Sequence, residues 1–340
     1  MRSTIKKVVI TAFGDESKLA IVEAELAEPG RHQVQVAVQY SVVAGSDVNM
    51  RRGTYPFQKK APLTPGYSVI GTVLHNGPGA SRFRVGDRVT CLTKYGGQAE
   101  RINLPEKYLV PVPNGIDAKT AVALPLDWVT AYEMLHRSAK VRAGQTIFVH
   151  GLSGGVGRAL LSLGKLAGVR VLGTAASSKH SELEKLGAVA FDYRTKDWMG
   201  AVQAQGGVDA VFDPLGYESF DESYAILNPT GILVAYGLNL PGLTGTPRRA
   251  VLPVFLRLFA KNLLLWRGRR TTFYGLTRAS KHYGPDLALL LGWLAEGKIT
   301  VPIKAVYALE QIQAAHREYA SSAGMGSIIV EIAGDCPNAA

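Results

Sequence analysis

The chain has 340 residues, of which 47% are hydrophobic and 19% are charged, and its formal net charge is +11. This composition excludes a disordered chain, and the apolar runs fall short of the roughly 20 residues that cross a membrane as a helix. Two cysteines, Cys91 and Cys336, exclude a disulfide framework and a four-thiolate zinc site. We expect a soluble, cytoplasmic protein of about two domains.

The first part of the chain, residues 1–116, has the pattern of a β-rich domain. Alternating runs such as residues 32–43 (HQVQVAVQYSVV) and 67–77 (YSVIGTVLHNG) predict strands, and proline and glycine separate them. Residues 123–139 (ALPLDWVTAYEMLHRSA) then predict a helix that Pro125 interrupts near its start.

From Gln145 onward, predicted strands alternate with predicted helices. Apolar residues 146–151 (TIFVHG) indicate a buried strand, residues 156–168 (VGRALLSLGKLAG) a helix, and residues 170–175 (RVLGTA) a second strand. Alternation of this kind indicates a parallel sheet with helices on both faces, and its order fits a doubly wound dinucleotide-binding fold. After about residue 280 the pattern predicts a helix, a strand, another helix and a last strand.

A glycine-rich turn connects the first of these strands to the next helix. Glycine lets a backbone turn tightly and approach a pyrophosphate closely, and the N–H groups at the start of the helix point at that phosphate. The strand–turn–helix context gives weight to the motif. We therefore predict that Gly154, Gly155, Val156 and Gly157 bind a dinucleotide cofactor.

The end of the second strand distinguishes between two cofactors. Enzymes that use NAD place an acidic residue there for the ribose hydroxyls, but residues 173–180 (GTAASSKH) contain none. Ser177 and Lys179 offer a hydroxyl and a positive charge instead, and Tyr193 follows the third strand. These groups favour the 2′-phosphate of NADPH, although Ser177 could simply cap the next helix and Lys179 could be a solvated lysine.

Positive charge is concentrated between Ser223 and Pro285, a span without Asp or Glu. A solvated face and a surface that attracts polyanions are both compatible with it. No nucleic-acid motif accompanies the charge, so we expect no nucleic-acid partner. An acidic carrier protein remains a hypothesis, and a membrane surface is less favoured because we expect residues 251–265 to form a buried helix. The basic residues are Arg248, Arg249, Arg257, Lys261, Arg267, Arg269, Arg270, Arg278 and Lys281.

Several motifs together resemble the medium-chain dehydrogenase/reductase superfamily, in its zinc-free quinone oxidoreductase branch and closest to the vesicle amine transport protein subgroup. They are SVVAGSDVNMRRGTYP, PGYSVIGTV, GDRV, ALPLDWVTAYEML and HGLSGGVG, in that order along nearly the whole chain. The resemblance implies an α/β protein with a GroES-like catalytic domain (residues 1–116 and 281–340) and a Rossmann NADP-binding domain (residues 117–280). It also implies an active site in the cleft, and a homodimer formed through the edge strand TTFYGLT.

The positions of the zinc ligands in zinc-dependent relatives are occupied by other residues. By the resemblance these positions correspond to Ala44, Tyr67 and Leu126, with Ser68 after Tyr67, and none forms a Cys/His ligand set. We therefore predict no metal site. Without a Lewis acid, simple alcohol oxidation is disfavoured, and hydride addition to a quinone or an enone needs less activation.

Candidate working residues follow from the same resemblance. Tyr55 matches a tyrosine at the mouth of the family's pocket, Tyr67 is an alternative proton donor, and water is a third source. Asn49 could bind a substrate carbonyl or satisfy the backbone, while Asp47 is expected to organise its loop and His150 to be structural. Beside the nicotinamide we expect Thr130, Gly237, Leu238 and Asn239.

The resemblance implies an NADPH-dependent reductase of a quinone or an α,β-unsaturated carbonyl. A narrower hypothesis is a reductive cyclisation or tailoring enzyme that acts on a long hydrophobic polyene of the polyketide type. The alternative class is a non-catalytic NADPH-binding protein at a membrane surface. We expect a small hydrophobic substrate in the first two cases.

Overall fold

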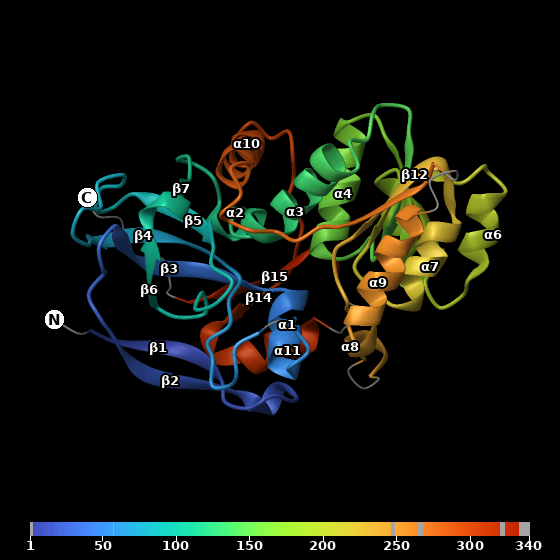
Figure 1. Cartoon of the computed structure of the whole chain (residues 1–340). Helices are drawn as coiled ribbons and strands as arrows, with labels where there is room; N and C mark the ends of the chain where they lie inside the picture. Colours follow the sequence, from blue (N-terminus) through green and yellow to red (C-terminus); the bar gives the residue numbers. More distant parts are fainter. Residues whose placement is uncertain (1–2, 57, 246–248, 264–267, 320–323, 333–340) are drawn as a thin grey trace. The chain divides into compact units, whose positions relative to one another are not determined.

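The chain divides into two units by its internal contacts. The computed structural model describes residues 3–332 apart from 57, 246–248, 264–267 and 320–323. One unit is Met1–Val129 with Thr277–Ala340, and the other is Thr130–Leu276 (Figure 1). The first unit therefore takes in residues 117–129 and 277–280, which the sequence analysis assigned to the second domain.

The first unit contains most of the antiparallel pairing. Within its described residues, one sheet follows the order β14 (Ile303–Ala308), β15 (Ser327–Glu331), β3 (Gln33–Val43), β4 (Ser68–Asn76), β5 (Arg88–Leu92), β7 (Val110–Pro111), with β6 (Arg101–Pro105) paired to β3. A separate hairpin joins β1 (Ser3–Ile10) to β2 (Leu19–Leu26). Strands from the two ends of the chain thus share one sheet, because β15 pairs with β3 (Figure 1).

Alternation along β3 explains the core of this unit. Val34, Val36 and Val38 point to the same face of the strand and are fully buried, in a cluster with Val69 and Val89 from β4 and β5. The helices of the unit are α1 (Gly45–Arg52), α2 (Ala118–Ala121), α10 (Tyr283–Ala295) and α11 (Ile312–Glu318).

The helix predicted over residues 123–139 forms with an irregular winding. Two π-helical turns, Leu124–Trp128 and Met134–Ser138, flank the short helix α3 (Val129–Glu133). Pro125 stands at the start of the first turn, where its missing N–H costs no hydrogen bond.

The second unit contains a parallel sheet. In its described part the strand order is β10 (Val189–Asp192), β9 (Arg170–Ala175), β8 (Thr146–His150), β11 (Val208–Asp213), β12 (Leu227–Ala235), β13 (Arg270–Phe273). All neighbouring strands in it are parallel. The order reverses between β8 and β11, so the carboxyl ends of these two strands mark the ligand-binding edge of a doubly wound sheet.

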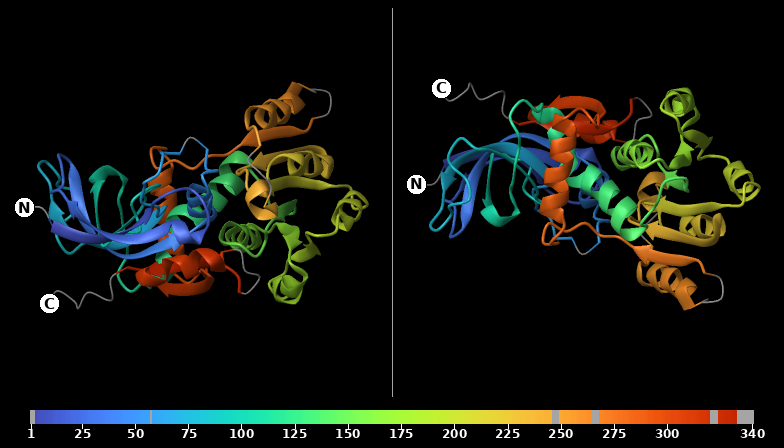
Figure 2. Two further views of the ribbon diagram at one scale, coloured as in Figure 1. Left: turned by 90° about the horizontal axis from the view of Figure 1, so that it is seen from below. Right: turned by 90° about the horizontal axis from the view of Figure 1, so that it is seen from above.

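Helices cover the faces of this sheet (Figure 2). They are α4 (Gly155–Leu166), α5 (His180–Lys185), α6 (Asp197–Gln203), α7 (Glu218–Ala225), α8 (Leu240–Thr244) and α9 (Leu252–Ala260). Helix α4 buries Leu160 and Leu163 at helical spacing, and Gly164 lets it approach the sheet, since an added Cβ would lie 2.9 Å from a methyl group of Val171.

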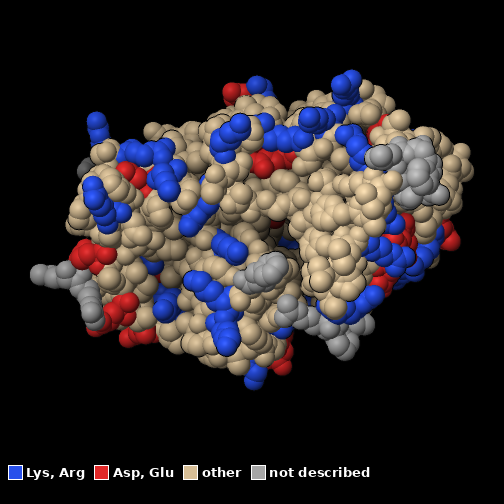
Figure 3. All heavy atoms as spheres, in the orientation of Figure 1, with Lys and Arg blue, Asp and Glu red and all other residues tan. Residues whose placement is uncertain are grey.

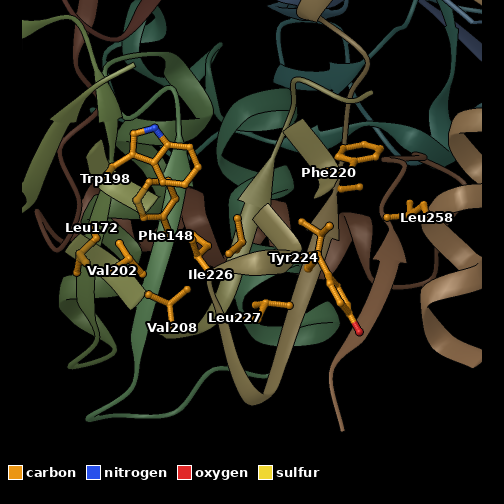
Figure 4. Close-up of a cluster of buried hydrophobic side chains, with 13 residues drawn as sticks. Phe148, Leu172, Trp198, Val202, Val208, Phe220, Tyr224, Ile226, Leu227 and Leu258 are labelled. Atoms are coloured by element: carbon orange, nitrogen blue, oxygen red, sulfur yellow. The ribbon is translucent and has the colours of Figure 1, made fainter. Parts of the chain in front are cut away.

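An aromatic cluster fills the core between the sheet and the helices of one face. The Phe148 ring lies 5.0 Å from Trp198 and 6.3 Å from Phe191 between centroids, and Phe220 and Tyr224 of α7 belong to the same cluster (Figure 4). Burial of this apolar area is the main stabilising contribution in the unit.

Helix α9 corrects one expectation, because the prediction that residues 251–265 form a buried helix is wrong. In the helix itself only Leu258 is buried. Arg257 is the one charged residue of α9, and apolar residues lie on the other positions; the helix packs on β13 through one face, and the other face stays exposed. The exposed residues are Leu252 (69% exposed), Leu256 (64%), Phe259 (45%) and, just after the helix, Leu263 (76%). Arg248, Leu264, Leu265 and Arg267 lie outside the described residues.

Every helix in the described part of the chain is too short or too polar to cross a membrane.

The Phe148 cluster predicts a clear effect on stability. Replacing Phe148 by Ala should lower the free energy of unfolding by about 3–5 kcal/mol, because the ring is fully buried and a cavity would remain. Urea unfolding followed by tryptophan fluorescence measures the change. Leu166→Ala is the control, since that side chain on α4 is 53% exposed. Equal losses in the two variants would contradict the burial of Phe148.

Candidate functional site

The carboxyl ends of β8, β9 and β11 are joined by a directed chain of hydrogen bonds. Gly151 N–H donates to Thr174 Oγ1 at 3.3 Å, and the Oγ1 of Thr174 lies 3.2 Å from Nδ1 of His150. Nε2 of His150 lies 3.1 Å from Ser223 Oγ, which donates to Asp213 Oδ2 at 2.7 Å. Because Ser223 donates onward, His150 carries its proton on Nε2 and accepts from Thr174 on Nδ1.

Asp213 is the acceptor at the end of this chain. It is completely buried and also accepts from Ser219 Oγ and Leu215 N–H, both at 2.7 Å. Burial lowers the pKa of His150, so the imidazole is neutral within the chain. His150 therefore has the structural role that the sequence analysis favoured, holding the strand ends below the glycine turn.

The glycine turn leaves the start of α4 open. Gly151 has a φ of +75°, which suits glycine, and a Cβ on Gly157 would lie 2.2 Å from the carbonyl oxygen of Gly151. Gly154 is the N-cap of the 12-residue helix α4, and no side chain caps it. The first N–H groups of the helix are thus offered to an anion, and the cradle fits the pyrophosphate of a dinucleotide.

Arg158 is a residue that the sequence analysis missed. It lies in the first turns of α4, and its Nε and Nη1 atoms are buried without a hydrogen-bond partner. Burial lowers the pKa of Arg158, against the attraction of Glu182. An orphaned guanidinium directly after the glycine turn is suited to a phosphate, and its signal in the sequence was only its place after Gly157.

The residues predicted to contact a 2′-phosphate lie at the end of β9. Ser177 and Lys179 belong to a short 3₁₀ turn that starts directly after the strand. The backbone N–H of Tyr193 donates to Ala175 O at 3.4 Å, which brings the loop after β10 to the same place. Arg194, also missed from the sequence, stacks 5.5 Å from the ring centre of Tyr193 and adds a second cation.

The other cofactor candidates are also in this unit. Gly237 leaves no room for a side chain, because a Cβ would lie 2.5 Å from Pro214 O, and Asn239 N–H donates to the same oxygen at 3.0 Å. Gly237, Leu238 and Asn239 therefore run beside the loop after β11. Thr130 is buried at the start of α3.

In the first unit, Asp47 holds two segments together. The completely buried carboxylate accepts from Ala44 N–H at 3.0 Å and from Gly66 N–H at 2.8 Å. It thereby connects the start of α1 to the residue before Tyr67, the loop-organising role that was expected. Burial raises the pKa of Asp47 to about 7, and nearby Asp127 adds to the effect.

Tyr55 and Tyr67 form a hydroxyl pair. Their oxygens are 2.6 Å apart and their rings meet edge to face at 6.1 Å. Burial raises the pKa of both phenols, and for Tyr67 the proximity of Tyr55 adds to it, so both carry their protons at neutral pH. Asn49 is close by, since its carbonyl accepts from Tyr55 N–H at 3.2 Å, but its side-chain Oδ1 already lies 3.4 Å from the Thr54 hydroxyl.

A second carboxyl in this unit depends on a neutral partner. Asp127 Oδ2 accepts from Ser327 Oγ at 2.7 Å, and burial raises the pKa of Asp127 to about 6. Ser327 supplies a hydrogen bond but no positive charge, so the effect of burial on the pKa of Asp127 outweighs the effect of the hydrogen bond.

The structure thus brings the predicted residues together in two groups, one in each unit. Among the described residues, no three His, Cys, Asp or Glu side chains are arranged to hold a metal ion. The residues that the resemblance matches to the zinc ligands of zinc-dependent relatives are Ala44, Leu126 and Tyr67, and Tyr67 is hydrogen-bonded to Tyr55.

Known proteins resemble the chain over nearly its whole length. The family described as alcohol dehydrogenase GroES-like domain matches residues 30–114, and that described as zinc-binding dehydrogenase matches residues 186–330. Synaptic vesicle membrane protein VAT-1 homolog of Rattus norvegicus is 31% identical, over 96% of this chain and 84% of that protein. Quinone oxidoreductase of the same species is 28% identical, over 96% and 97%. Mycobacterial Rv1454c, solved in complex with NADPH, has a TM-score of 0.83 at 27% identity, over 96% and 100%.

Asp127 predicts a specific pH dependence of stability. Its pKa is raised on folding from 3.8 to about 6, so its contribution is present at acid pH and is lost as the pH rises through about 6. Between about pH 4 and pH 8 the native chain should lose about 3 kcal/mol relative to Asp127→Asn. Urea unfolding at both pH values measures this, with Asp197→Asn at an exposed position as the control. Parallel curves for the native chain and Asp127→Asn would contradict the shift.

Proposed function

We propose a function from one premise: the chain belongs to the medium-chain dehydrogenase/reductase superfamily, in the branch of the quinone oxidoreductases and VAT-1 homologs. It is therefore an oxidoreductase. Within that class we propose that it uses NADPH to reduce a quinone or an α,β-unsaturated carbonyl compound, without a catalytic zinc ion.

The cofactor assignment is supported by the end of β9. A hydroxyl and a lysine follow the strand where an NAD enzyme has a carboxylate, and Arg194 contributes a further positive charge. The uncapped start of α4 fits the pyrophosphate, and Arg158 offers unpaired donors. A related structure holds NADPH. When bound, NADPH supplies a hydride.

One observation carries the proposed reaction: Tyr55 and Tyr67 form a largely buried pair of protonated hydroxyls. By the resemblance, Tyr67 corresponds to a zinc-ligand position of zinc-dependent relatives, and its hydroxyl lies 2.6 Å from that of Tyr55. These hydroxyls can donate a hydrogen bond or a proton, but they cannot act as a Lewis acid toward an unactivated carbonyl. An electron-poor double bond suits this chemistry, because its β-carbon accepts hydride without a metal.

The two tyrosines have different roles in this proposal. The substrate oxygen gains negative charge as hydride adds, and Tyr55 Oη donates to it. Tyr67 then donates to Tyr55 Oη, which stabilises the phenolate character left there. Asp47 positions the loop before Tyr67 through Gly66 N–H, and it needs no contact with substrate.

The remaining assignments are proposals of the same kind. The substrate is a small hydrophobic molecule, the location is the cytoplasm, and a homodimer forms through β13. Strand β13 is at the end of the sheet order, so one of its edges has no strand neighbour among the described residues. The polyene-tailoring hypothesis falls within this substrate class.

The proposal that an acidic carrier protein docks on the basic residues between Ser223 and Pro285 has less support than the reductase proposal. Arg257 and Lys261 both pair with Asp221, at 2.8 and 2.7 Å, and Arg249 pairs with Glu218 at 2.6 Å. The same pairing weakens the membrane-surface alternative, although the exposed apolar face of α9 favours it. Vesicle cosedimentation would distinguish that alternative.

Lys179 predicts the cofactor preference. We expect Lys179→Ala to weaken NADPH binding by about 10- to 100-fold. The assay is NADPH oxidation by the purified chain, with quinones, short enones and extended polyenones as acceptors. NADH binding should stay unchanged, because it has no 2′-phosphate. Lys185→Ala on α5 is the control, since it removes an exposed lysine of the same unit. Absence of NADPH oxidation with every acceptor would overturn the proposed reaction.

Tyr55 predicts the proton-donating step. Tyr55→Phe should lower kcat by roughly 100-fold with little change in KM, because the hydroxyl acts on charge that develops during the reaction. Tyr67→Phe should give a smaller loss, since its hydroxyl acts through Tyr55. Tyr40→Phe controls for loss of a buried phenol in the same unit. Full kcat in Tyr55→Phe would overturn this role and leave Tyr67 or water as the proton source.

A further inference from the structure

A cavity in the first unit lies apart from the residues used above. It has a volume of about 680 Å³ and lies between the segment around β7 and the start of α10. Its cationic and aromatic lining residues are Arg82, Lys107, Tyr108, Arg278, Lys281 and Tyr283. All of them belong to the same unit, so the cavity is complete within it.

The lining of this cavity carries four positive charges and no carboxylate. None of the four cations makes an ion pair with any described residue. Two acids lie nearby outside the lining: Glu106 accepts from the N–H groups of Ser81 and Arg82 at 2.8 and 2.7 Å while its carbonyl accepts from Arg82 Nη1 at 3.3 Å, and Asp286 is buried in the first turn of α10. The lining itself therefore has an excess of positive charge, which favours a bound anion. Figure 3 shows Lys and Arg side chains on the face where Figure 1 places α10 and β7.

Two of the lining side chains are held in place by β5. Arg278 donates from Nη1 to Leu92 O at 3.1 Å and stacks 4.6 Å from the ring centre of Tyr108. The hydroxyl of Tyr283 accepts from Leu92 N–H at 2.9 Å. A guanidinium fixed in this way loses little freedom when it binds a phosphate.

Helix α10 adds to the positive potential of the cavity. The helix has 13 residues, its first residues line the cavity, and no side chain caps its N-terminus. Its dipole points its positive end toward the same space as the four cations. This contribution is secondary to the side-chain charges.

We propose that this cavity binds the diphosphate group of a small molecule. Four cations match the several charges of a diphosphate, and the volume lies within the range of about 300–1,000 Å³ that is usual for small-molecule sites. The ring of Tyr108 is already covered by Arg278, so the phosphates and not a stacked base are recognised. The site is independent of the proposed reductase reaction.

Calorimetric titration with inorganic pyrophosphate tests the proposal. The full chain is compared with Lys107→Glu/Lys281→Glu in the absence of NADPH, because NADPH carries a diphosphate of its own and would compete for the cavity. Any binding of pyrophosphate at the glycine turn is common to both proteins, so their difference reports the cavity. Both lysines are exposed, so the fold should persist, as circular dichroism checks. We expect affinity for pyrophosphate to fall about tenfold or more in the double variant. Lys185→Glu, the same charge change in the other unit, should leave it unchanged.

A second titration separates the sources of the diphosphate. ADP binding with an affinity close to that of pyrophosphate, and equally sensitive to the double variant, supports recognition of the diphosphate alone. ADP binding without pyrophosphate binding overturns the proposal, and so does pyrophosphate binding that the double variant leaves unchanged. Failure of the reductase assay would not affect either result, because these titrations measure no turnover.

Discussion

The hydrogen-bond chain from Gly151 to Asp213 is the constraint on which the cofactor half of the molecule depends. It joins the ends of three parallel strands at the point where the strand order reverses. Each hydroxyl in it accepts from one neighbour and donates to the next, so no member can turn without breaking a buried bond. The glycine turn above it, and the open start of α4, are thereby fixed before any ligand arrives.

The first unit relies on a single buried carboxylate in a comparable way. Asp47 accepts from two separate segments, and the hydroxyl pair of Tyr55 and Tyr67 follows from that junction. Asp127 is a second buried carboxyl in the same unit, and its hydrogen-bond partner Ser327 is neutral, so burial raises the pKa of Asp127 to about 6. In both units, buried polar groups position the candidate site residues, and the apolar cores hold the layers together.

Local sequence signals predicted much of this arrangement. Strand–helix alternation and the glycine turn are short-range patterns, so the parallel sheet and the uncapped α4 could be read from them. The 2.6 Å contact of Tyr55 with Tyr67 could not, because it depends on how two loops close on Asp47. The exposure of Leu252 and Leu256 was missed for a related reason: apolar residues lie on the exposed face of this helix as well as on the covered one, so apolar residues alone do not show which face meets the sheet. Arg158 was missed because its significance is the absence of a partner.

The discontinuity of the first unit has a consequence for biosynthesis. Strand β3 pairs with β15, which is synthesised after the whole of Thr130–Leu276, whereas Thr130–Leu276 is continuous and has all its described strands once residue 276 emerges. The inserted unit can therefore complete its sheet before β15 is available to pair with β3. During that interval one edge of β3 is exposed to other nascent chains, and a chaperone that shields β edges would act on this protein at that stage of translation.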